Sequence, residues 1–449
     1  MSKIKMSSEL SGYNFGLWRV WPSIAIPELR AGSAGFLVSE SQLAWITSLL
    51  YLGFLLTPFF CSYLVVKCGR KTILYTTSLI HVMSWLLVVI ATSPIFLYTA
   101  NFFGGLAGGI GMTMVPCYVS EISSVTIRGA LIGSFLVFIN IGQVLMVNMG
   151  IWMNYHQTNL FGLICASCTF CLQFFVLTES PFYLLASRKD DAARKAYKHF
   201  HAIKCSTDEY KGRIETEIAT LKSAVEKDME RKSSYLELLS CKRAFIILVV
   251  ESFFQNLGGA NSMLAFGVIS LPETEKFLSP HQTILVCVIS GTLFNCLSSS
   301  IVDRVGRKPL LVVSVGLCSI WAGGLACYYY MVEEVGVAWD DYEYVPHILL
   351  ILFIASYTSG FAISRSLIIG EYFPTNTRTH AGLVSTFCFA TAGFVVTLSF
   401  LHVVRLIGLY FMFFIFALVN FINFWFSLFF FVETKGKSLF EIQEYLKNL

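Results

Sequence analysis

Eleven long apolar segments recur along this chain, and they constrain its fold more than any other feature. A helix needs about 20 apolar residues to cross the hydrocarbon of a bilayer. A twelfth, shorter stretch at 12–29 is interrupted by Arg19, Pro22 and Pro27. The sequence therefore predicts an all-α, multi-pass membrane protein whose first helix is shortened. The eleven segments cover 43–66, 72–92, 95–118, 130–153, 158–178, 244–271, 281–302, 309–331, 347–370, 381–404 and 408–432.

Composition excludes a soluble protein and gives no sign of a prosthetic group. Hydrophobic residues make up 55% of the 449 residues, charged residues make up 13%, and the mean hydropathy is +0.67. A soluble chain of this size has too little interior to bury so much apolar surface. The first dozen residues are polar, so no cleavable signal peptide is expected. Cys165, Cys168 and Cys171 have a spacing known from iron–sulfur sites, but they lie in an apolar helix and are read as packing residues. No cofactor or metal is predicted.

The basic residues of the loops predict the orientation. Lys and Arg gather in loops on one side of the predicted spans and in the polar segment 182–243. The loop 333–343 on the other side carries five acidic residues and no basic one. Basic loops remain on the cytosolic side of a membrane. A multi-pass protein of the cell membrane with both termini in the cytosol is therefore expected.

Segment 182–243 divides the chain. Its mixed charges and periodic apolar residues predict short amphipathic helices, with a solvated linker as the alternative. The predicted organisation is an N-terminal bundle of helices 1–6 at 1–181 and an intracellular helical domain at 182–243. A C-terminal bundle of helices 7–12 at 244–432 and a cytosolic tail at 433–449 follow.

Short motifs at the cytosolic ends of the spans occur twice. Gly69-Arg70-Lys71 recurs as Gly306-Arg307-Lys308, Glu121 with Arg128 recurs as Glu371 with Arg378, and Glu179 recurs as Glu433. Repeats of six helices with a substrate site between them are typical of transporters. A carboxylate and a guanidinium at facing helix ends can pair strongly and hold that face closed. The alternative is that these residues only anchor the helix ends.

Taken together, these motifs resemble the sugar-porter branch of the major facilitator superfamily, and within it the insect facilitated trehalose transporters. The resemblance covers nearly the whole chain and implies twelve helices and transport by alternating access. It implies a cytosolic gate of acid–arginine pairs. The matching segments are 69–71, 116–121, 128–129, 178–185, 253–261, 303–308, 370–378 and 432–442. The gate residues are Arg70, Lys71, Glu121, Arg128, Glu179, Asp303, Arg304, Arg307, Lys308, Glu371, Arg378 and Glu433.

The resemblance also implies that the seventh span contacts sugar through Gln255, Asn256 and Asn261. Amide side chains both donate and accept hydrogen bonds, as sugar hydroxyls do. Gly258 and Gly259 weaken the helix there, and discontinuous helices often line transporter sites. The alternative is that these amides bond neighbouring helices.

Several positions depart from the family pattern. Val66 replaces an acid, Asn101 an arginine, Leu136 a glutamine and Gly291 an asparagine. The hinge of the tenth span reads Ala362-Ile363-Ser364-Arg365-Ser366, without its prolines and tryptophan. Several contacts to sugar are thus missing, so the identity of the substrate does not follow from the resemblance.

Three charged residues, Arg19, Glu251 and Arg365, fall within apolar spans. An unpaired charge at mid-depth costs about 2.5–3.5 kcal/mol. Glu251 lies one helical turn before Gln255, so both are expected to face the cavity, where Glu251 is predicted to pair with Arg365. The alternatives are that each reaches water, or that Glu251 couples transport to protons.

The predicted function is facilitative uniport of trehalose or a hexose by a monomer in a lipid bilayer, with no nucleic-acid partner and no enzymatic activity. The absence of a P-loop excludes ATP-driven transport by this chain alone. The alternatives are a sugar sensor of the same fold that does not transport, and a facilitator of another small polar solute.

Overall fold

The computed structural model describes residues 2–122, 125–200, 218–219, 222–223, 238, 241–274, 277–337, 342–374, 377–435 and 441–442. Within these ranges the side chains of 2–6, 62–67, 125–133, 199–200, 299 and 303 are not described.

The described residues form helices joined by short connections. The first half contains α1 (Ser2–Arg30), α2 (Glu40–Cys68), α3 (Arg70–Val89), α4 (Pro94–Ile122), α5 (Val125–Trp152) and α6 (Tyr155–Val176), followed by the short helices α7 (Pro181–Ala186) and α8 (Asp190–Phe200). The second half contains α11 (Lys242–Leu257), α12 (Ala260–Ser270), α13 (Pro280–Val305), α14 (Arg307–Glu333), α15 (Val345–Ser356), η1 (Tyr357–Phe361), α16 (Ala362–Tyr372), α17 (Arg378–Leu406) and α18 (Leu409–Phe430).

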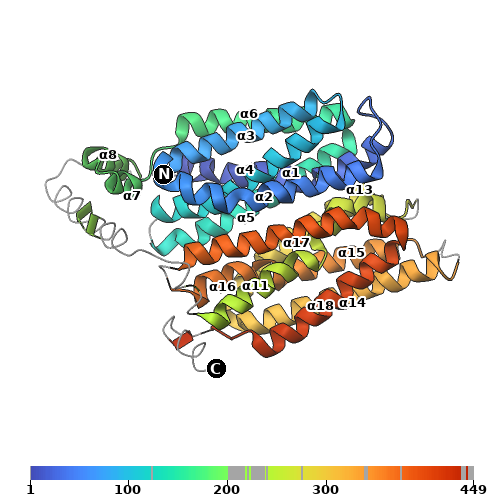
Figure 1. The fold of residues 1–449 in the computed structure, drawn as a ribbon. Coiled ribbons are helices and arrows are strands. Elements are labelled where there is room, and N and C mark those ends of the chain that lie inside the picture. The colour runs from blue at the N-terminus through green and yellow to red at the C-terminus, as the bar shows by residue number, and fades with distance from the viewer. Residues whose placement is uncertain are drawn as a thin grey trace.

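The two halves form two helical bundles that lie side by side (Figure 1). They meet where α1 packs on α12, α2 on α17, and α5 on α13. The start of α1, the end of α18 and helices α7 and α8 lie at one end of the bundles (Figure 1). We call this the motif end, because the repeated motifs at 69–71, 179, 306–308 and 433 lie there. Each half therefore begins and ends on the same side.

Ten helices in the described part of the chain are long and apolar enough to cross a membrane. Helix α1 and the pair α11–α12 complete the predicted set of twelve. The first helix differs from the expectation in its length, because α1 covers 29 residues. Its Arg19 and prolines lower its hydropathy without ending the helix, and α4, α5, α6 and α12 cover it. Trp18 and Trp21 are almost fully buried in this contact.

Local sequence explains where several spans begin and why they pack closely. Helices α2, α6 and α13 each start with a capping box, in which Ser39, Asn154 or Ser279 accepts from the third helical N–H. Glycine allows α2 and α4 to approach closely, because a Cβ at Gly105 would clash with the carbonyl oxygen of Leu50. The glycine-rich run at 104–111 thus serves helix packing.

The polar segment between the bundles is described only in part. Helices α7 and α8 pack on each other through a small apolar cluster that includes Leu185 and Ala193. Helix α8 begins with acidic residues, whose negative charge interacts favourably with the positive end of the helix dipole. Most of 201–240 lies outside the described residues. The division into domains remains a prediction.

Candidate functional site

Arg70 and Glu121 form an ion pair at the motif end of the first half. Nη2 of Arg70 lies 3.1 Å from Oε1 of Glu121, and its Nε lies 3.1 Å from the same oxygen. Both side chains are nearly buried, and the guanidinium also lies over the ring of Tyr183, 5.2 Å from its centre. Glu179 accepts from the backbone N–H groups of Arg70 and Lys71 at 2.8 and 3.1 Å. One cluster thus joins α3, α4 and the connection between α6 and α7.

The second half repeats this cluster. Nη2 of Arg307 lies 3.2 Å from Oε1 of Glu371. Glu433 accepts from the backbone N–H groups of Arg307 and Lys308 at 3.1 and 3.0 Å. The preceding glycine, Gly306, has φ +105°, and a Cβ there would press on the Glu433 carboxylate. The predicted pairs are thus placed together within each half.

Glu179 and Glu433 act differently from the expectation. The resemblance implies that both pair with arginine side chains in the outward-open state. In this structure each binds the free N–H groups that begin a helix, at α3 and α14. Those groups carry partial positive charge and have no partner within the helix. Partial burial pushes the pKa of the Glu433 carboxyl upward, but backbone N–H donors, including those of Arg307 and Lys308, outweigh it and lower the pKa below its ordinary value.

The other predicted gate residues have different surroundings. Arg378 donates from Nε to the carbonyl oxygen of Phe373 at 3.1 Å. The side chain of Arg304 is exposed, and its carbonyl oxygen accepts from Lys435. The side chains of Arg128 and Asp303 lie outside the described residues.

Two tyrosines complete the clusters and were not predicted. Tyr118 donates to the carbonyl oxygen of Thr178 at 2.6 Å, and Tyr372 donates to that of Val432 at 2.8 Å. Each thereby holds the residue before the capping glutamate. Tyr118 precedes Glu121 by three residues, whereas Tyr372 directly follows Glu371, and these positions differ by about one helical turn. This shift hides the repeat in the sequence.

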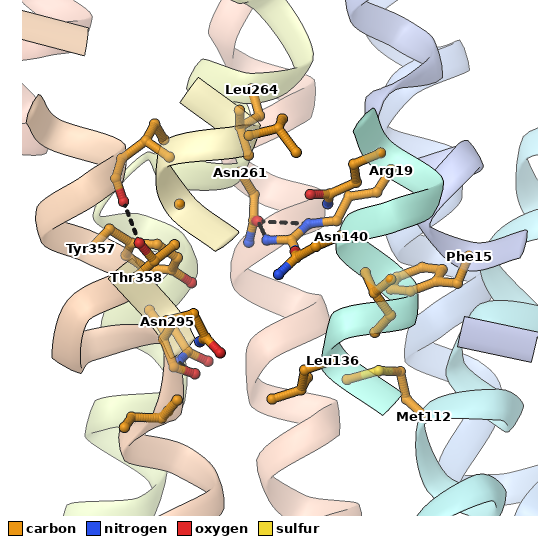
Figure 2. A pocket seen from close by; sticks show the side chains of 18 of the residues that line it. Phe15, Arg19, Met112, Leu136, Asn140, Asn261, Leu264, Asn295, Tyr357 and Thr358 are labelled. Carbon is orange, nitrogen blue, oxygen red and sulfur yellow. Dashed lines mark hydrogen bonds between the residues drawn. The ribbon is translucent and has the colours of Figure 1, made fainter. Parts of the chain in front are cut away.

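A cavity of about 130 Å³ lies between the two halves. Its polar lining comes from both bundles, and Figure 2 shows Arg19, Asn140 and Asn261 side by side at one wall. Asn140 and Gln143 lie three residues apart on α5, so they share a helix face. The polar lining residues are Arg19, Tyr51, Asn140, Gln143, Gln255, Asn261, Asn295, Tyr357, Thr358, Arg365 and Ser366.

The seventh span is broken where its glycines predicted. Helix α11 ends at Leu257, α12 begins at Ala260, and Gly259 between them has φ +90°. Gln255 and Asn261 line the cavity from either side of the break. Gln255 donates to the carbonyl oxygens of Phe361 and Ala362 at 2.9 and 3.0 Å.

Asn256 is buried and does not line the cavity. Its amide donates to the carbonyl oxygen of Phe389 at 2.6 Å and accepts from Asn261. Asn261 in turn accepts from Arg19 across the interface between the halves. Asn256 therefore bonds a neighbouring helix, as the alternative in the sequence analysis states. It also holds the side chain of Asn261 by accepting its hydrogen bond.

Several departures from the family pattern line the cavity, including Leu136, Gly291 and Arg365. Positions that the resemblance singles out thus line this cavity even where the residue types differ. It did not indicate Tyr51, Asn140, Gln143, Asn295 or Tyr357. The pair Asn140 and Gln143, polar and three residues apart in an apolar span, is the sequence signal that identifies this wall.

The predicted pair of Glu251 and Arg365 is not formed in this structure, and this is a correction. Glu251 is fully buried, accepts from Ser427 of α18 at 2.8 Å, and does not line the cavity. Arg365 lines the cavity, with its guanidinium over the ring of Phe389, 4.4 Å from the centre. One helical turn separates Glu251 from Gln255, but Glu251 points toward α18.

Comparison with known proteins identifies the family. A family model described as "Sugar (and other) transporter" matches residues 6–446. The chain belongs to the sugar transporter family. Members of this family are transporters rather than enzymes, and the chain is accordingly a multi-pass membrane protein.

Among curated proteins, similar chains include three facilitated trehalose transporters called Tret1. Those of Aedes aegypti and Culex quinquefasciatus are each 26% identical over 98% of this chain, which covers 54% and 84% of their lengths. That of Drosophila willistoni is 25% identical over 98% of this chain and 50% of its own. The chain spans about half the length of the first and last of these relatives.

Solved structures show the same fold. The xylose transporter XylE from E. coli in an inward open conformation matches with a TM-score of 0.79, at 17% identity over 99% of each chain. XylE bound to 6-bromo-6-deoxy-D-glucose matches with a TM-score of 0.73, at 18% identity over 99% of this chain and 98% of that one. At these identities the likeness establishes the major facilitator fold alone.

Proposed function

We propose that this chain carries a sugar across the cell membrane by alternating access, as a facilitative uniporter. The observation that carries the proposal is the central cavity, whose polar lining comes from both bundles. Its amides and hydroxyls suit a ligand rich in hydroxyls. Rocking of the two bundles about such a site exposes it to one side at a time. Trehalose and hexoses are the first substrates to test, because similar curated proteins are called trehalose transporters.

We propose further that the motif end faces the cytosol, since the basic loops lie there. The two acid–arginine clusters would then stabilise one of the two conformations that alternate. Each joins helices within its own half: α3 with α4, and α14 with α16. Among the described residues, these pairs fix helix ends within each bundle.

Radiolabelled sugar uptake in cells that lack their own sugar transporters tests this function. Saturable uptake of trehalose or a hexose, equal in both directions and independent of a proton gradient, is expected. An epitope at the C-terminus checks surface expression. Absence of uptake for trehalose, hexoses, polyols, sugar acids and sugar phosphates, with normal surface expression, would refute the proposal.

One observation favours a second function, a sugar sensor that binds without transporting. The tenth span runs from α15 through η1 into α16 without a break, in contrast to the seventh. It also lacks the proline hinge that its resemblance implies. Binding of sugar by the purified chain without flux in proteoliposomes would establish the sensor.

A further inference from the structure

Two arginines, one from each half, face the same cavity. Arg19 comes from α1 and Arg365 from α16, and both line the space between the bundles. Among the described residues that line this cavity there is no aspartate or glutamate. Glu251, which belongs to a neighbouring span, bonds Ser427 and does not line the cavity. The cavity wall therefore carries two positive charges and no negative one.

The partners of both arginines are neutral. Arg19 donates from Nε and Nη2 to the amide oxygen of Asn261. Arg365 lies over the Phe389 ring, and its Nη1 is buried without a hydrogen-bond partner. An amide and an aromatic face orient a guanidinium but leave its charge uncompensated. Donors also remain, because a guanidinium has five N–H groups.

The two charges act on each other across the interface between the halves. Arg19 and Arg365 line one cavity of about 130 Å³, together with Tyr357, so their like charges face the same small space and repel. Charges at membrane depth normally pair with an opposite charge or with a substrate. In the described structure neither arginine has an acidic partner. An anion that enters the cavity would remove this repulsion and supply the missing acceptor.

We propose that the sugar accepted by this cavity bears an oxyanion group, a carboxylate or a phosphate, which is held between Arg19 and Arg365. This inference rests on the proposed transport function for its role, but not for the binding itself. The guanidinium is suited to both groups, because its planar fork bonds two oxygens at once. Amides such as Asn140, Gln143 and Gln255 remain for the hydroxyls of the ring.

The position of the arginines on opposite halves couples binding to conformation. Without an anion, the repulsion between Arg19 and Arg365 opposes the approach of the halves. A bound oxyanion attracts both and draws α1 and α16 toward the ligand. Occupancy then favours the closed intermediate through which alternating access must pass. A neutral sugar with the same ring makes no such bridge.

Binding to the purified chain in nanodiscs tests the proposal with matched ligands. Glucose and glucuronate share a ring and differ in one group, a hydroxymethyl against a carboxylate, and glucose 6-phosphate supplies the phosphate. Titration calorimetry at constant ionic strength is expected to show glucuronate or glucose 6-phosphate binding at least about tenfold more tightly than glucose. The two anionic ligands distinguish a carboxylate from a phosphate. Equal or tighter binding of glucose would overturn the proposal, and this comparison needs no variant.

Variants assign the preference to the two arginines. R19Q and R365Q are each expected to reduce the anion-to-glucose ratio to near one, whereas R365K, which keeps the charge but loses the fork, retains part of it. The matched control is R405Q, which removes an exposed arginine of α17 outside the cavity. A preference that survives in both glutamine variants would also overturn the proposal.

Flux separates this inference from the proposed function. If proteoliposomes carry glucose and trehalose while the anions neither bind nor pass, the transport function stands and the anion site fails. If glucuronate binds with the expected preference but no sugar passes, the anion site stands and the transport function fails.

Discussion

The arginines at the motif end and those at mid-membrane differ in their partners. Arg70 and Arg307 each lie beside a glutamate, at 3.1 and 3.2 Å. Arg19 and Arg365 have, among the described residues, an amide and an aromatic ring. A paired charge stabilises a particular arrangement of helices, whereas a charge without an opposite partner remains available to a ligand. We therefore propose that the paired arginines set conformation and that the two without an opposite charge select the substrate.

The largest effect is expected from R70A. The substitution leaves the Glu121 carboxylate nearly buried without its partner, and it removes the contact with the Tyr183 ring. Breaking this pair should destabilise the arrangement by about 2 kcal/mol, between the values for exposed and buried pairs. Uptake should fall several-fold at unchanged surface expression, with a lower melting temperature of the purified chain. R243A, at an exposed arginine of α11, is the control and should behave as the wild type.

A smaller effect is expected from R307A in the second half. Its pair has side chains 18% and 26% exposed, against 11% and 10% for Arg70 and Glu121. Solvent screens the more exposed pair, so we expect a loss of about 1 kcal/mol. The melting temperatures of R70A and R307A, measured side by side, check the order. A larger loss in R307A would show that burial does not set the strength of the two clusters.

The ion pairs at the motif end were predictable from the sequence, whereas the surroundings of the two mid-membrane arginines were not. The repeat of Arg70 with Glu121 as Arg307 with Glu371 predicted the motif-end pairs, because recurring motifs at matching helix ends imply matching contacts. The twelve helices followed from the apolar segments and the break at Gly258 and Gly259. These features depend on residues close in sequence or duplicated along it.

The cavity was less predictable, since it depends on how helices rotate against each other. The spacing of Glu251 and Gln255 predicted that both face the cavity. In the structure Glu251 contacts α18, and only Gln255 lines the cavity. A helix inside a bundle has neighbours on every side, so two residues of one face need not share a partner. The contact of Arg19 with Asn261 joins the two halves of the chain, and no pattern of nearby residues in the sequence indicates it.

Acidification should weaken the second-half cluster through Glu433. Backbone N–H donors hold its pKa below the ordinary value of 4.5, despite the opposing effect of burial. A lowered pKa means that this contribution is fully present above the ordinary value and is lost as the pH falls through the lowered one. As the pH falls below the ordinary pKa of 4.5 and through the lowered pKa of Glu433, the melting temperature should therefore drop more steeply in the wild type than in E433Q. Parallel pH profiles for the two proteins would contradict this role.

The smallest effect is expected for the coupling energy between Glu251 and Arg365, the two mid-membrane charges that the sequence predicts to pair. Glu251 bonds Ser427, Arg365 faces the cavity, and no ion pair joins them in the described structure. In a double-mutant cycle of E251Q and R365Q, the effects on the free energy of unfolding should add within about 0.5 kcal/mol, as for residues that share no partner. The cycle of R70A and E121A, whose side chains touch, is the positive reference and should not add. Coupling of Glu251 to Arg365 as strong as that reference would mean that Arg365 has an acidic partner in a populated state. The charge would then hold helices in place, as those at the motif end do, and would not be available to a ligand.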